Sequence, residues 1–145
     1  MTTHTQSNDL HAAPPRTAFV WSAGGWLGAQ LGSTLWMALL GLALMGRDVP
    51  SAVVCLAGFA LANAIGTALW RARERRSAYA AIQMFLASLA VLVAILVLVV
   101  RARGATDAAS EGLWASTYLP VWIVAFVPAM MVVFHLRELR ARRSS

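Results

Sequence analysis

The sequence predicts an all-α integral membrane protein, a four-transmembrane-helix bundle with up-down-up-down connectivity. Four stretches contain no Asp, Glu, Lys or Arg, and each is at least 22 residues long: 18–46, 49–70, 77–100 and 112–136. A helix of ~20 residues is enough to cross the hydrocarbon core of a bilayer. The chain is also 59% hydrophobic over 145 residues, which leaves little material for a soluble domain.

A polar tail of residues 1–17 precedes the bundle and contains Pro14 and Pro15, so we expect it to be disordered. The first apolar stretch is too long for the core of a cleavable signal peptide, and we expect it to be retained as an anchor. The transmembrane domain is expected over residues 18–140, with a basic tail at 141–145. The expected spans are 19–45, 50–70, 78–100 and 119–136.

The first two spans carry small residues at four-residue spacing. The residues are Gly24, Gly28 and Gly32 in the first span and Gly58, Ala62 and Gly66 in the second. Such strips let helices approach closely in lipid, where no hydrophobic effect drives helices together. The strips are expected to pack on each other within one chain, with a subunit interface as the alternative.

Uncharged polar side chains recur in the first three spans. They are Gln30, Thr34, Asn63, Thr67 and Gln83. The three amides among them, Gln30, Asn63 and Gln83, are expected to gather in the cytoplasmic half. One interpretation is that these groups form hydrogen bonds between helices and fix the register of the bundle. The other is that they line a path for a small ion or polar solute.

The third span has no polar residue after Ser88, and the fourth contains Pro120 and Pro128. Pro120 falls in the first helical turn, where a missing N–H has little effect. Pro128 lies in the middle of the span, and we expect a kink there that is structural or serves as a hinge.

The orientation follows from the arginines. With four spans, one side of the membrane receives nine arginines and the other receives only Arg47, Arg101 and Arg103. The positive-inside rule therefore places both termini in the cytoplasm of a bacterial inner membrane. Arg71, Arg73, Arg75 and Arg76 form one cytoplasmic loop, which we expect to contact anionic lipid headgroups rather than nucleic acid.

Several function classes lack the residues that they need. No carboxylate, Lys or Arg lies within a span, which argues against a proton-coupled antiporter. The three histidines, His4, His11 and His135, cannot pair across the bundle to hold a haem, and Cys55 has no second cysteine. We therefore expect no enzyme activity, cofactor or metal.

Two functions are left open. The first is a passive channel or facilitator for a small ion or polar solute, which is slightly favoured because the chain has no extramembrane domain through which to act. The alternative is a non-catalytic accessory or scaffold subunit of a larger membrane complex. In both cases we expect a homo-oligomer or a partner membrane subunit.

Overall fold

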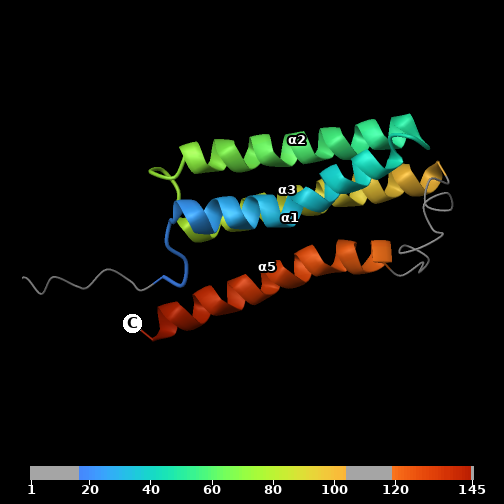
Figure 1. The fold of residues 1–145 in the computed structure, drawn as a ribbon. Helices are drawn as coiled ribbons and strands as arrows, with labels where there is room; N and C mark the ends of the chain where they lie inside the picture. Colours follow the sequence, from blue (N-terminus) through green and yellow to red (C-terminus); the bar gives the residue numbers. More distant parts are fainter. Residues whose placement is uncertain (1–16, 104–118, 145) are drawn as a thin grey trace, which may run out of the picture.

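The computed structural model describes residues 17–103 and 119–144, and four α-helices account for most of them. The helices are α1 (Ala23–Leu44), α2 (Val49–Arg71), α3 (Ala78–Ala102) and α5 (Leu119–Arg143). Successive helices run in opposite directions, so the predicted all-α, up-down-up-down arrangement is confirmed (Figure 1). Residues 1–16, most of the expected tail, and 104–118, between the third and fourth expected spans, lie outside the described residues.

The helix starts follow from capping residues in the sequence. Ser22 precedes α1 and its hydroxyl accepts a hydrogen bond from the Gly25 N–H, at 3.3 Å. Ser77 does the same for α3, accepting from the Ala80 N–H at 3.2 Å. α2 has Pro50 in its first turn, where backbone N–H groups have no partner within the helix, so the missing N–H of proline costs no hydrogen bond. Because Ser22 caps it, α1 begins four residues after the expected start.

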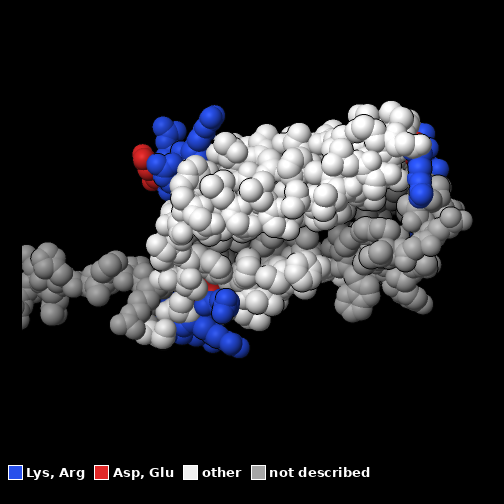
Figure 2. All heavy atoms as spheres, in the orientation of Figure 1, with Lys and Arg blue, Asp and Glu red and all other residues white. Residues whose placement is uncertain are grey.

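Three of the helices are long and apolar enough to cross a membrane: Ala23–Leu44, Val49–Arg71 and Ala78–Val99. The charged side chains lie at the two ends of the bundle, and an apolar band separates them on the face seen in Figure 2. This is the distribution that a bilayer imposes, because a charge in the hydrocarbon core is costly. The chain is a multi-pass membrane protein.

The core forms where α2 packs on α1, α3 packs on α2 and α5 packs on α3. Met37, Leu44, Cys55 and Val93 are almost completely buried in it. Phe85 and Leu89 extend the core along α3. Large apolar side chains such as Leu35 and Leu39 are instead exposed on the outside of α1, as expected for helices that face lipid tails.

α5 continues seven residues beyond the apolar stretch expected to end at Leu136, and ends at Arg143. Arg142 contributes to this extension because its Nε donates to Glu138 Oε1 at 3.0 Å, one helical turn away. Arginines in the last turn also complement the negative end of the helix dipole. Most of the expected tail of 141–145 is therefore helical.

The segment before α1 is anchored against the end of α5. The Ala18 N–H donates to Glu138 Oε2 at 3.0 Å, and the Phe19 ring lies 5.2 Å from that of Phe134 and 6.1 Å from that of Tyr79. The start of α1 and the end of α5 consequently lie at the same end of the bundle (Figure 1).

Candidate functional site

Three of the predicted polar residues meet between α1 and α2, and we call them the amide cluster: Gln30, Thr34 and Asn63. The Gln30 Nε2 donates to the Asn63 Oδ1 and backbone carbonyl, both at 3.0 Å. The Asn63 Nδ2 donates to Thr34 Oγ1 at 3.1 Å, and the Thr34 hydroxyl donates to the Gln30 carbonyl at 2.8 Å. Gln30 and Thr34 are buried, so the cluster is a closed polar contact inside the helix pair.

Gly66 is the point on α2 where two side chains of α1 converge. The Trp26 Nε1 donates to the Gly66 carbonyl at 3.1 Å. A Cβ at Gly66 would lie only 2.5 Å from Gln30 Cδ and 2.6 Å from Gln30 Oε1. That oxygen is buried and has no hydrogen-bond partner among the described residues. Only glycine leaves room for Gln30 at this position.

The other predicted polar residues do not join the amide cluster. The Gln83 Nε2 donates to the Met131 carbonyl on α5, at 3.0 Å. Thr67 is exposed on α2. The sequence placed three amides together in the cytoplasmic half, and the structure brings two together while the third connects α3 to α5.

The glycine strip of α1 does not pack within the described chain, which corrects the expectation that the two strips pack on each other. Gly24, Gly28 and Gly32 are exposed, and no atom of another element lies within 4 Å of the position that their Cβ would take. The reason lies in the polar groups on the opposite face of α1. Trp26 and the amide cluster carry polar groups that need partners in an apolar medium, so that face turns toward α2.

The strip on α2 does pack inside the chain, but against different residues. A Cβ on Gly58 would lie 3.6 Å from Leu96 Cδ1 and 3.7 Å from Met37 Sδ. Ala62 is 1% exposed. The close approach on α1 is made instead by Gly41, where a Cβ would lie 2.8 Å from Leu56 Cγ and 3.1 Å from the Ala52 carbonyl oxygen.

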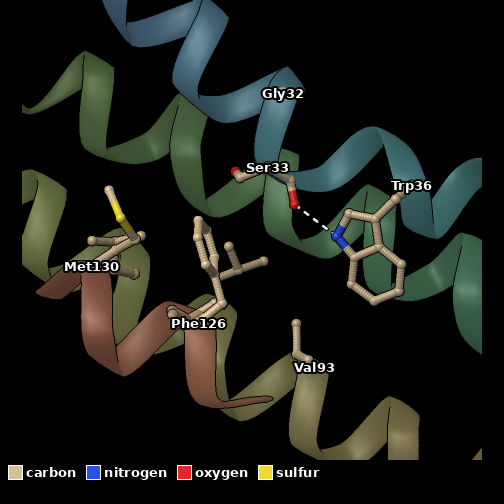
Figure 3. A pocket seen from close by; sticks show the side chains of 9 residues that line it. Gly32, Ser33, Trp36, Val93, Phe126 and Met130 are labelled. Carbon is tan, nitrogen blue, oxygen red and sulfur yellow. Dashed lines mark hydrogen bonds between the residues drawn. The ribbon is translucent and has the colours of Figure 1, made fainter. Parts of the chain in front are cut away.

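A cavity of about 360 Å³ opens between α1, α3 and α5 (Figure 3). Its lining consists of Gly32, Ser33, Trp36, Leu86, Leu89, Val93, Phe126, Val127 and Met130. We call this cavity the lateral groove. None of the predicted polar residues lines it, and apolar side chains dominate its surface.

The predicted headgroup residues lie on the connection between α2 and α3 and are all exposed: Arg71, Arg73, Arg75 and Arg76. The Arg73 guanidinium lies over the Trp70 ring, 5.0 Å from its centroid. The Arg76 carbonyl accepts a hydrogen bond from Trp21 Nε1 at 3.0 Å. These side chains and the arginines of α5 lie at the same end of the molecule (Figure 2).

Asp48 ties the α1–α2 turn to the end of α3 at the opposite end of the bundle. The Arg103 Nη2 donates to Asp48 Oδ1 at 3.1 Å, and the Ser51 hydroxyl donates to Asp48 Oδ2. The hydrogen bond from Arg103, followed by that from Ser51, holds the pKa of Asp48 below its ordinary value.

The sequence analysis missed three residues that make specific contacts. Trp26 stands one turn before Gln30 on the same face of α1, and this spacing was a usable signal. Glu138 is 2% exposed and accepts hydrogen bonds from the Ala18 N–H and the Arg142 Nε. Tyr79 Oη lies 2.6 Å from His135 Nδ1. Nothing in the sequence indicated that a segment before the first helix would dock on α5.

Among the described residues, no group of three or more His, Cys, Asp or Glu is close enough to hold a metal ion. Comparison of the chain with protein families, with curated proteins and with solved structures finds no match.

Proposed function

We propose that this multi-pass membrane protein is a non-catalytic subunit that holds another transmembrane helix against the outward face of α1. The observation that carries the proposal is the exposed glycine strip. Gly24, Gly28 and Gly32 repeat every four residues, and no element of the described part of the chain lies within 4 Å of their Cβ positions.

A partner helix gains van der Waals contact and backbone proximity on such a strip, which lipid tails reproduce poorly. Three glycines in a helix interior also lower the intrinsic helix propensity of α1 by up to about 1 kcal/mol each relative to alanine. A close helix contact offsets that cost. The partner is a second copy of this chain or a different membrane subunit.

The placement of the polar side chains favours this role over the channel. The members of the amide cluster bond to each other and to the backbone, and Gln83 bonds to α5 instead of extending the cluster. A conducting path needs polar groups that remain available to replace the hydration of a solute. The lateral groove, in contrast, is apolar.

One observation keeps the channel as a second candidate. Gln30 Oε1 is a buried acceptor without a partner in the described chain, and a hydrated path would supply one. The variant Asn63→Leu, assayed in liposomes together with wild type, separates the two candidates. Ion or solute flux that is present in wild type and lost in the variant supports the channel, whereas no flux in wild type supports the subunit.

The membrane setting is part of the proposal. α5 forms the fourth crossing, both termini lie in the cytoplasm of a bacterial inner membrane, and the loop at Arg71, Arg73, Arg75 and Arg76 contacts anionic headgroups. The arginine distribution in the sequence supports this orientation.

Replacement of Gly28 by Leu tests the docking surface. The added side chain projects into the space that a partner helix would fill, so we expect the complex extracted in mild detergent to become smaller while the monomer still folds. Ala60→Leu is the matched control, because Ala60 is also exposed but lies on α2, away from the strip. An unchanged complex size and an unchanged yield for Gly28→Leu would mean that the strip faces lipid only.

A further inference from the structure

The lateral groove has a buried floor and an exposed rim. Leu89, Val93 and Val127 lie at its floor and are at most 6% exposed. Phe126, at its rim, is 64% exposed, and Gly32 opposite it on α1 is exposed as well. Figure 3 shows Phe126 and Met130 on α5 facing Gly32 and Ser33 on α1 across this space. The groove therefore opens sideways, toward the lipid.

The groove offers no polar group to a polar occupant. Ser33 and Trp36 are the two lining residues with polar side-chain atoms. The Ser33 hydroxyl donates to the Gln30 carbonyl at 3.1 Å, and the Trp36 Nε1 donates to the Ser33 carbonyl at 2.9 Å. Both donors are thus used within α1. An apolar chain fits this lining, and water or a polar solute does not.

Small residues continue along α1 from the groove toward the end of the bundle where α1 begins. At 100° per residue, Gly25 and Ala29 share the side of α1 that presents Gly32 and Trp36 to the groove. Both are exposed, and the only described neighbour within 4 Å of a Cβ on Gly25 is Ser22 of the cap. We call this side of α1, between Ser22 and the groove, the small-residue track.

On α5, the side of the helix that lines the groove ends in a cationic residue. Phe126, Met130, Val133 and Arg137 are spaced i, i+4, i+7 and i+11, which places them along one side of the helix. Arg137 lies 11 residues from Phe126, or ~16 Å along the helix. One leaflet of the hydrocarbon core is about 15 Å thick. When Phe126 lies at the bilayer midplane, Arg137 is consequently level with the lipid headgroups.

The charge of Arg137 is available for a headgroup. Arg137 is exposed and forms neither of the two ion pairs of the described chain. The adjacent Glu138 does not compete for it, because that carboxylate is buried and accepts hydrogen bonds from the Ala18 N–H and the Arg142 Nε. A phosphate matches an exposed guanidinium in charge and in hydrogen-bonding geometry.

We propose that the lateral groove is a lipid-binding site for an anionic phospholipid, with one acyl chain lying along the small-residue track into the groove and the phosphate at Arg137. The inference rests on α5 crossing the membrane, as proposed above, but not on the partner helix. Gly32 belongs to both surfaces, so the test variants are placed on α5, away from the glycine strip.

The experiment compares lipid retention by native mass spectrometry after purification from nanodiscs of equimolar phosphatidylglycerol and phosphatidylcholine. Wild type is expected to retain phosphatidylglycerol over phosphatidylcholine. Arg137→Gln should reduce that preference at least fivefold. Arg143→Gln is its matched control, because Arg143 lies about 120° around α5 from Arg137. Met130→Trp fills the groove and should abolish retention of both lipids, whereas Val132→Trp, on the exposed side of α5, should not.

Equal retention of the two lipids by wild type, or a preference that Arg137→Gln leaves unchanged, would overturn the assignment of the headgroup. Retention that survives Met130→Trp would overturn the assignment of the groove, and a wild type that retains no lipid overturns both. If Gly28→Leu reduces the size of the complex but retains lipid normally, the lipid site stands independently of helix docking. Failure of the lipid site and failure of helix docking are therefore distinguishable.

Discussion

At the scale of single residues, the glycines of this chain divide into two kinds with opposite surroundings. Gly66 is enclosed, because Gln30 fills the space where its side chain would be. Gly28 is open, with no neighbouring element within reach of a Cβ. The two residues look alike in the sequence, since both belong to strips of small residues at four-residue spacing. The effect of the same substitution should therefore differ between them.

We expect Gly66→Ala to lower the stability of the bundle by roughly 1–3 kcal/mol, as overpacking of a filled site usually does. The new methyl group must displace Gln30 and break its bonds to Asn63. Gly28→Ala should be neutral in the isolated chain or stabilise it by up to about 1 kcal/mol, because alanine is the better helix former. Thermal unfolding of the two variants in one detergent measures the difference.

Combining Gly66→Ala with Gln30→Ala provides the internal check. If the clash causes the destabilisation, the double variant should lose less than the sum of the two single losses. Additive losses would mean that Gln30 and Gly66 act independently, which contradicts the contact between them.

At the scale of elements, different contacts join the helices at the two ends of the bundle. At the end that holds the described termini, Ala18, Phe19 and Glu138 join the segment before α1 to α5. At the other end, Asp48 joins the α1–α2 turn to Arg103, just beyond α3. Both sets of contacts link elements that are far apart in the sequence, and both lie outside the apolar band, so their charged groups avoid the hydrocarbon core.

The contacts of Asp48 predict that the stability of the folded protein depends on pH. Its pKa is lowered from the ordinary value of 3.8 in the folded protein, so the stabilisation is fully present above that value and is lost as the pH falls through the folded pKa. Wild type should accordingly have a higher Tm than Asp48→Asn at pH 7, and the gap should close in acid. Glu74→Gln, which removes an acidic charge outside both ion pairs, serves as the control.

At the scale of the whole molecule, the charge asymmetry and the helix arrangement agree. Figure 2 shows basic side chains at both ends of the bundle. The arginines of the α2–α3 connection and those of α5 lie at one end, whereas Arg47 on the α1–α2 turn and Arg101 and Arg103 at the end of α3 lie at the other. Among the described residues, the packing also leaves the glycine strip of α1 without a neighbouring element. The proposed partner helix and the proposed lipid would therefore occupy adjacent surfaces of this bundle.

The arginine asymmetry predicts the orientation in cells. A cysteine probe between residues 108 and 112 should react with a membrane-impermeant maleimide added outside intact cells, whereas probes at Arg75 and Ser144 should react only after permeabilisation. The buried Cys55 is replaced by Ala in all probe variants to remove background labelling. Reaction of the Arg75 probe in intact cells would reverse the assignment.

The sequence by itself determined the membrane class, the helical architecture and the approximate helix ends. These properties follow from local quantities: the length of uncharged apolar stretches, the capping residues Ser22 and Ser77, and the positions of the arginines. It also indicated that Gln30, Thr34 and Asn63 are polar groups inside the bundle, because any polar side chain in a span needs a partner.

Only the tertiary structure decided which faces meet. In lipid, the packed side and the lipid-facing side of a transmembrane helix are both mostly apolar, so hydropathy alone does not distinguish them. The inward face of α1 was chosen by the polar atoms of Trp26, Gln30 and Thr34, which find partners on α2, and this choice turned the glycine strip outward. The separation of Gln83 from the amide cluster and the groove between α1 and α5 likewise depend on helix rotations, which residue spacing within one span does not fix.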